Sequence, residues 1–340
     1  MRPMQYMLAV LLLLAAFGSA WCQESKIPIG AIEFFGVNGY DVKRIRAALP
    51  VAEGREISQA DSPMVRDGIA EAVKRTTGHA PTDVAFVCCD NRGGALIYIG
   101  LPQPGGETFR YKPRPNGNVR LPDQAARLYD ETMDLNSTGV RIQPGEDGSK
   151  GYALSLYPPL RAKELAMREF AVDRGVMLRR VVLQAADDRQ RAIAAHLLGY
   201  ARQSSAQIQT LVSASSDPDE SVRNNATRAL GVLASSSAAI ARSIPADPFI
   251  TMLNSGTWTD RNKGGWVMSQ LSATRDPRLL RKIRGQALSS LIEMAQWRDS
   301  HAQSARWILG RIAGIPEAEL AKLVAAPDAE QIITAAERAR

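Results

Sequence analysis

Apolar positions along the first hundred residues alternate in three short stretches and recur at helical spacing between them. A predicted strand ends at Gly36, helices are predicted to start after Asp41 and at Ser62, and two more strands are predicted at 84–88 and 95–99. The apolar positions are, in order, Ile32 and Phe34; Val42, Ile45, Ala48 and Leu49; Val65, Ile69 and Val73; Val84, Phe86 and Cys88; and Ala95, Ile97 and Ile99. The predicted order is therefore strand, helix, helix, strand, strand.

This order resembles a POTRA (polypeptide-transport-associated) domain over roughly Ile27 to Leu101. The resemblance is carried by Ile32-Glu33-Phe34-Phe35-Gly36, Tyr40-Asp41-Val42-Lys43-Arg44-Ile45 and Leu49-Pro50-Val51-Ala52-Glu53-Gly54. It implies a periplasmic module that binds polypeptide, often by adding a strand to a sheet edge, where unpaired backbone groups supply the hydrogen bonds. We expect the sheet edge beside Gly36 to be involved. A small α+β domain that only packs on its neighbour is the alternative.

The second half of the chain, from about residue 161, has helical spacing almost to its end and repeats itself. Residues 191–199 and 223–231 align on Ala, Leu and Gly, and weaker copies occur at 266–271 and 305–310. The matched leucines are Leu198, Leu230, Leu271 and Leu309. A repeat of two helices with loops of variable length gives such uneven spacing, because only the packed helices keep register.

This half resembles HEAT repeats, chiefly in Asp219-Glu220-Ser221-Val222-Arg223 leading to Ala226 and Leu230-Gly231. The resemblance implies an all-α solenoid that serves as a scaffold for protein partners. Each helix pair buries its apolar stripe against the next pair. The predicted fold class is therefore an α+β N-terminal domain at 23–102 followed by an all-α HEAT-like solenoid at 161–340.

The midsection, 103–160, is predicted to be a proline- and glycine-rich linker with a short hairpin and a helix. Residues 108–112 alternate as a strand does, and a helix is predicted from Asp123 to about Leu135. The polar stretch 144–151 lacks the alternate acidic spacing of a calcium loop, so we interpret it as a turn.

Residues 1–22 have the layout of a secretory signal peptide. Arg2 precedes an uncharged run from Met7 to Phe17, and small and polar residues follow to Cys22. The run is shorter than the ~20 residues that a membrane-spanning helix needs. Cleavage after Ala20 and cleavage after Cys22 both fit, whereas lipidation of Cys22 fits poorly because bulky Trp21 precedes it. We expect an exported, periplasmic or secreted protein with no transmembrane segment once the signal is removed.

Composition adds limits to this picture. A chain of 340 residues with 45% hydrophobic and 23% charged residues is globular rather than disordered. The net charge of +7 indicates mild attraction to anionic surfaces, and we expect no nucleic-acid partner. Cys88 and Cys89 are adjacent, and on a strand they would point to opposite faces, so we expect two unpaired thiols, one of them buried.

A search for catalytic motifs finds none, so the sequence predicts no catalytic residue, no metal and no cofactor. The histidines are His79, His196 and His301, and none belongs to a metal-ligand or triad spacing. His196 lies inside a repeat helix, where surface or packing roles are more common than general-base catalysis. The alternative that stays open is an envelope enzyme with a site at the junction of the two halves, near 103–160.

The best candidate partner-binding residues form a basic ridge on one predicted helix. Arg278, Arg281 and Lys282 lie three and four residues apart, and Arg284 follows them. An acidic protein or another anionic component of the cell envelope would fit this ridge, although most such charge runs are simply solvated. Trp258, Trp297 and Trp307 either anchor a partner or pack between repeats. The favoured function is an exported interaction scaffold of the bacterial envelope, which binds polypeptide partners through a sheet edge and a helical-repeat surface.

Overall fold

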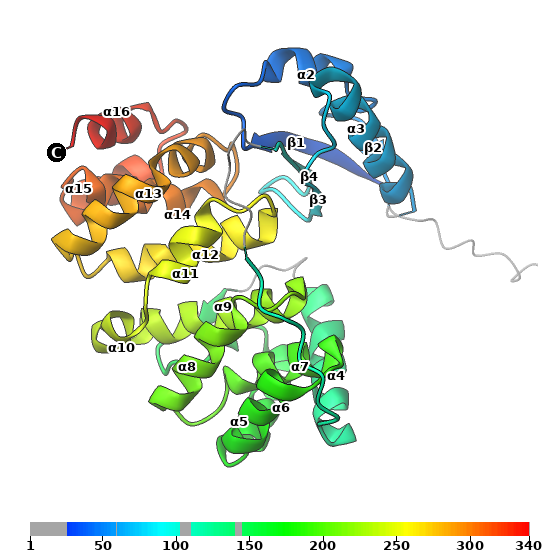
Figure 1. The fold of residues 1–340 in the computed structure, drawn as a ribbon, viewed down its shortest axis with the longest axis vertical. Coiled ribbons are helices and arrows are strands. Elements are labelled where there is room, and N and C mark those ends of the chain that lie inside the picture. Colours follow the sequence, from blue (N-terminus) through cyan, green and yellow to red (C-terminus); the bar gives the residue numbers. More distant parts are fainter. Residues whose placement is uncertain (1–25, 59, 103–109, 140–144, 340) are drawn as a thin grey trace, which may run out of the picture.

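The computed structural model describes residues 26–58, 60–102, 110–139 and 145–339. In Figure 1 a small sheet with two helices lies beside a longer stack of helices. Among the described residues, no helix is both long enough and apolar enough to cross a membrane. The predicted signal peptide lies outside the described residues.

The N-terminal part is a four-stranded sheet covered on one face by two helices. Its elements are β1 (Ile27–Phe35), α2 (Val42–Ala48), β2 (Glu56–Ile57), α3 (Ser62–Thr77), β3 (Asp83–Val87) and β4 (Ala95–Gly100). The strand order is β2-β1-β4-β3, with β1 parallel to β4 and β3 antiparallel to it. The two-residue strand β2 is too short to leave a pattern in the sequence, and we did not predict it.

Local signals place the helices of this part. The side chain of Asp41 accepts a hydrogen bond from the backbone N–H of Arg44, which caps α2 as predicted. Gly78 ends α3 with a positive φ of 80°, a conformation that glycine adopts without strain. The N-cap of α3 is Asp61, one residue before the predicted cap, and the Asp61 carboxylate accepts a hydrogen bond from the N–H of Ser58.

The two faces of the sheet belong to different cores, because successive strand residues point to opposite faces. Ile97 and Ile99 of β4 pack with α2 and α3, whereas Leu96 and Tyr98 join the core of the helical half. The sheet is therefore held between its own helices and the helical stack. At the junction of the two halves, Leu96 and Tyr98 of the sheet are therefore part of the same buried apolar core as the helices of the array.

The helical half, which we call the helical array, contains thirteen described helices. They are α4 (Asp123–Gly139), α5 (Pro158–Val172), α6 (Gly175–Gln184), α7 (Asp188–Leu198), α8 (Ser205–Ala214), α9 (Glu220–Ser236), α10 (Ala238–Ser243), α11 (Asp247–Leu253), α12 (Trp258–Ser272), α13 (Pro277–Ala295), α14 (Ala302–Ile312), α15 (Glu317–Val324) and α16 (Glu330–Arg338). Helices α7, α9, α12 and α14 contact one another in turn, and each packs on the helix before it in the chain. A two-strand ladder, β5 (Glu146–Asp147) with β6 (Leu154–Ser155), precedes α5.

The repeat motif found in the sequence occupies equivalent positions in α7 and α9. Gly199 and Gly231 end the two copies, and a Cβ atom at Gly231 would overlap the ring of Trp266 on α12. A Cβ atom at Gly199 would crowd Ala229 on α9 in the same way. The matched glycines are therefore explained by the close approach of neighbouring repeats.

Buried arginines near the starts of α7 and α9 connect each of these helices to the repeat that follows it. Arg191 donates to Asp217 at 2.8 and 2.9 Å, and Arg223 donates to Asp260 at 2.8 and 3.3 Å. Each guanidinium also donates to two carbonyls of the loop just before its own helix. These four side chains are at least 93% buried, and the same bonding pattern recurs in both copies.

The midsection packs on the helical array. Helix α4 starts at Asp123 as predicted and packs against α5 and α7. Residues 110–122, which we call the strap, run extended across the starts of the array helices (Figure 1). Residues 110–122 do not form the predicted hairpin with one another, because backbone groups of the strap bond to the array instead. Residues 108–109 of the predicted hairpin lie outside the described part of the chain.

The prediction of two unpaired cysteines is wrong in this structure. Cys88 and Cys89 form a disulfide with each other, with their Cα atoms 3.1 Å apart. Cys88 is exposed and Cys89 is half-buried. The expectation failed because β3 ends at Val87, so neither cysteine is held in the alternating geometry of a strand.

Candidate functional site

Strand β1 pairs with β2 only at Ile27 and Pro28. Beyond that pairing, its outer side and the turn after it are covered by Glu53 of the N-terminal part and by side chains of the helical array. Glu293 of α13 accepts hydrogen bonds from the backbone N–H groups of Gly36 at 2.9 Å and Val37 at 3.0 Å. The same carboxylate pairs with buried Arg261 of α12 at 2.9 Å. Trp297 donates its indole N–H to the carbonyl of Phe34 at 3.3 Å. The sheet edge beside Gly36, where we expected a partner strand, is therefore used to hold the two halves together.

A second set of charged contacts lies next to this one. Arg298 donates to Glu33 at 2.7 Å and to Glu53 at 2.6 Å. Burial raises the pKa of Glu33 above its ordinary value, although the bonds from Arg298 oppose that rise. The hydrogen bond from Arg298 lowers the pKa of Glu53, which is more exposed. The arginine thus connects a strand and a loop of the N-terminal part to the array.

Tyr98 brings an ionisable cluster into the same junction. Its hydroxyl donates to Asp299 at 2.6 Å and lies 3.0 Å from Nδ1 of His301, which is 2.6 Å from the other carboxylate oxygen of Asp299. Burial, followed by the charge of Asp299, raises the pKa of Tyr98 strongly. Burial alone would raise the pKa of Asp299, but the bonds from His301 and Tyr98 outweigh it and lower that pKa. The three side chains are hydrogen-bonding partners of one another, as expected of groups that hold the two halves together.

The open edge of the sheet is β3. It pairs with β4 on one side, and no described strand lies on its other side. A groove of about 300 Å³ runs along that side. It is lined by all five residues of β3 together with Arg66 of α3 and Glu220, Trp258 and Thr259 at the starts of α9 and α12. The sequence pattern predicted the strand β3. It contained no signal that the outer side of β3 is unpaired while the outer side of β1 is covered.

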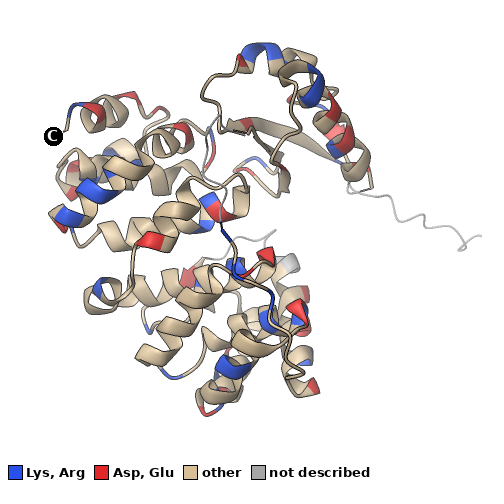
Figure 2. Ribbon diagram, in the orientation of Figure 1, with Lys and Arg blue, Asp and Glu red and all other residues tan. Residues whose placement is uncertain are grey.

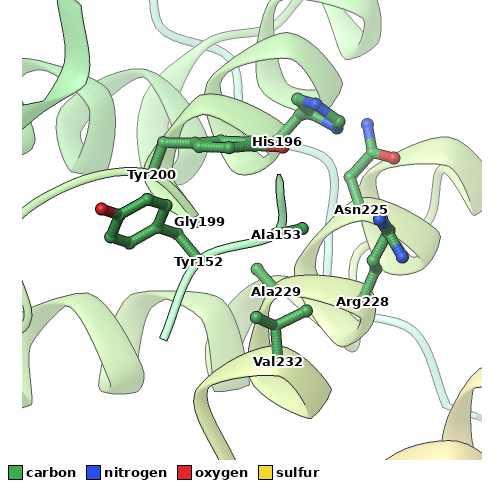
Figure 3. Close-up of a pocket in the computed structure, with 9 residues that line it drawn as sticks. All are labelled: Tyr152, Ala153, His196, Gly199, Tyr200, Asn225, Arg228, Ala229 and Val232. Carbon is green, nitrogen blue, oxygen red and sulfur yellow. The ribbon is translucent and has the colours of Figure 1, made fainter. Parts of the chain in front are cut away.

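Between the midsection and the repeats is a small pocket around His196 (Figure 3). Burial, and secondly the charge of Arg228, lowers the pKa of His196 to about 3, so its imidazole is neutral at physiological pH. Its Nε2 atom has no hydrogen-bond partner among the described residues. The cavity holds about 20 Å³, which is room for about one water molecule.

The enzyme alternative placed a site at the junction of the two halves, near 103–160, and this pocket contains Tyr152 and Ala153 of that stretch. Ionisable side chains meet there, since the ring of Tyr200 lies 5.7 Å from that of His196 and 6.4 Å from that of Tyr152 (Figure 3). The imidazole ring of His196 packs edge-on against Tyr129 at a centroid distance of 5.2 Å. The position of His196 matches the packing role considered from the sequence.

Glu164 of α5 is a buried carboxyl beside this pocket, 4% exposed, and it holds β6 by accepting the N–H of Ser155 at 2.5 Å. Burial raises its pKa to about 7, so the folded state binds a proton that the unfolded state releases at lower pH. Stability from this group is therefore present at about pH 4 and is lost as the pH rises through about 7. Glu164→Gln is expected to raise the free energy of unfolding by up to about 3 kcal/mol near pH 8 and to change it little near pH 4.

Urea unfolding of Glu164→Gln and the wild type at both pH values measures this difference. Glu169→Gln, an exposed carboxyl on the same helix, serves as the matched control. An equal effect of Glu164→Gln at both pH values would show that protonation of Glu164 does not contribute.

The basic ridge predicted from the sequence lies on α13, and the structure uses half of it internally. Lys282 forms an ion pair with Asp247 of α11, and Arg284 donates to the carbonyl of Glu337 at the end of α16 at 3.0 Å. Arg278 and Arg281 are exposed and form no ion pair within the described part of the chain. Two of the four side chains therefore already have partners within the chain, and partner binding by the ridge stays a prediction.

The three tryptophans serve packing in this structure. Trp297 is 1% exposed and Trp258 is 8% exposed, and both rings lie 4.9 Å from the ring of Tyr98. Trp307 is half-buried, with the guanidinium of Arg311 5.0 Å from its centroid. Trp258 also lines the groove beside β3.

Comparisons with known proteins concern the helical array. The HEAT repeat model matches residues 208–237, which span most of α8 and all of α9. A crystal structure of computationally designed armadillo repeat proteins for modular peptide recognition matches with a TM-score of 0.37 and 15% identity, over 54% of this chain and 94% of the other. A designed armadillo repeat protein in complex with the peptide (KR)4 matches with a TM-score of 0.37 and 16% identity, over 54% and 93%.

No curated protein matches the chain. The match at 208–237 coincides with the repeat copy that resembled HEAT repeats most in the sequence. The second half of the chain is therefore a helical repeat region whose central helix pair is similar to the HEAT repeat.

Proposed function

We propose that this protein is a protein-binding scaffold whose N-terminal domain, a POTRA-like module, takes an extended polypeptide segment as an additional strand on β3. The observation that carries the proposal is the open edge of β3 above a groove of about 300 Å³. Unpaired backbone groups on an edge strand bind an incoming strand by main-chain hydrogen bonds.

The other edges of the sheet are less suited to this role. Strand β2 has two residues and offers little length for pairing. The part of β1 beyond its pairing with β2, and the turn after it, are bonded by Glu293, Trp297 and Arg298 of the array. By contrast, β3 has five residues and all of them line the groove. A strand bound there would contact both halves of the protein, since Trp258 and Thr259 of α12 form the opposite wall.

The helical array supplies a second surface in this proposal. Arg278 and Arg281 on α13 are exposed and suit an acidic protein or another anionic component of the envelope. Export is part of the same proposal: the signal-peptide pattern of residues 1–22 supports a periplasmic or secreted location. Cell fractionation with N-terminal sequencing of the recovered chain tests export and distinguishes cleavage after Ala20 from cleavage after Cys22.

The strand proposal is tested with a neutral peptide of about eight residues that alternates Val and Thr, a pattern that suits strand addition. Hydrogen exchange of the full chain, measured with and without the peptide, is expected to show added protection at residues 83–87. Thr259→Trp fills the groove and is expected to abolish that protection. Ser289→Trp, an exposed position on α13 outside the groove, is the matched control.

Circular dichroism and thermal unfolding establish that both variants are folded. Protection of β3 in the wild type and in Ser289→Trp, but not in Thr259→Trp, is the supporting result. Peptide binding without protection of β3, or no peptide binding at millimolar concentration, would overturn the proposal.

A further inference from the structure

The groove beside β3 has one carboxylate that is free to meet a bound segment. Glu220 is the first residue of α9, is exposed and lines the groove. It makes no ion pair or side-chain hydrogen bond within the described part of the chain. The other acid of the groove, Asp83, is already engaged because it accepts the backbone N–H of Trp258 at 2.8 Å. We propose, resting on the proposed function above, that the segment bound on β3 is basic and that its Lys or Arg side chains pair with Glu220.

The strap shows that this side of the array accepts an extended basic chain. Its residues 110–120 include four basic side chains and no acidic one, at Arg110, Lys112, Arg114 and Arg120. The strap runs along the starts of α7 and α9, and Figure 2 shows blue basic positions on it beside those helices. The strap, which lies on this side of the array, is thus both basic and extended.

Specific contacts hold the strap there. The backbone N–H of Lys112 donates to the carbonyl of Ser216 at 2.8 Å, and its Nζ donates to Ser213 at 2.6 Å. Arg114 pairs with Asp188 at the start of α7 at 3.5 Å. Tyr111 lies over the guanidinium of Arg223, one turn into α9, at 4.3 Å. Glu220 is on the same first turn of α9, so the groove continues the surface that the strap occupies.

The two faces of β3 determine on which side the basic residues of a bound segment would lie. Ala85 and Val87 point toward the core of the array, whereas Val84 and Phe86 point toward α2 and α3. Side chains of an added strand alternate in the same way. Arg66 of α3 lies over Phe86 at 5.6 Å and disfavours a cation on that face. The bound segment is therefore expected to alternate basic residues, toward Glu220, with apolar residues, toward α3.

The experiment compares labelled peptides of about eight residues that alternate Val with Lys, Val with Thr and Val with Glu, titrated against the full chain by fluorescence anisotropy. The Val-Lys peptide is expected to bind the wild type most tightly. Glu220→Lys is expected to weaken Val-Lys binding about fivefold and to strengthen Val-Glu binding by a similar factor. Glu169→Lys, which makes the same charge change at an exposed position on α5, is expected to leave both affinities unchanged.

Hydrogen exchange at β3 distinguishes a failure of the basic specificity from a failure of strand addition itself. Equal affinities for Val-Lys and Val-Thr, or equal effects of Glu220→Lys and Glu169→Lys, would overturn the basic specificity. If the peptides still protect residues 83–87 in that case, strand addition stands without it. If no peptide protects β3, the proposed function fails and the specificity fails with it.

Discussion

Asp260→Ala is expected to lower the free energy of unfolding by about 3–5 kcal/mol, because it leaves a buried guanidinium without its counter-ion. Asp260 is fully buried and accepts hydrogen bonds from Arg223 at 2.8 and 3.3 Å and from the hydroxyl of Ser255 at 2.9 Å. Arg223 is only 3% exposed, so water does not replace the lost carboxylate. The pair also joins α9 to α12, and its loss removes a contact between successive repeats.

Urea unfolding followed by circular dichroism measures this loss. The matched control is Asp173→Ala, which breaks the pair of Asp173 with Arg202, whose side chains are 76% and 72% exposed. Exposed pairs contribute about 0–1 kcal/mol, so the control is expected to change little. Similar losses in the two variants would show that burial does not set the strength of the Arg223–Asp260 pair.

Trp297→Ala is expected to destabilise the protein by about 3–5 kcal/mol, the range for removal of a fully buried aromatic side chain. Trp297 follows α13, is 1% exposed and packs edge-on against Tyr98 of β4 at a centroid distance of 4.9 Å. It also donates to the carbonyl of Phe34 in β1. The substitution removes apolar contact from the junction itself, so it loosens the attachment of the sheet to the array.

Hydrogen exchange measures the destabilisation by Trp297→Ala and shows in which elements it occurs. Amides of β1 and β4 are expected to exchange faster in Trp297→Ala, whereas amides of α5–α7, at the far end of the array, are expected to change less. Trp307→Ala is the control, since that ring is half-buried and lies outside the junction. Uniformly faster exchange along the whole chain would indicate that the two halves unfold as one unit instead of separating at the junction.

The sequence by itself determined the features that depend on near neighbours. The cap at Asp41, the end of α3 at Gly78 and the start of α4 at Asp123 follow from residues within one helical turn. The repeat register was also visible, because Arg191 and Arg223 start copies that end in the matched glycines. The alignment identified the positions of these arginines, although it did not show that each pairs with an acid of the next repeat.

Only the tertiary structure decided which surfaces are open. Glu293 covers the backbone of Gly36, 257 residues away in the chain, so the predicted edge is closed and β3 is open instead. Lys282 and Arg284 look like unpaired ridge residues in the sequence, but Lys282 pairs with Asp247 of α11 and Arg284 donates to a carbonyl at the end of α16. The physical reason is common to both cases: apolar spacing reports which side of an element is buried, whereas the partner of a charge or an unpaired backbone group is set by contacts between distant segments.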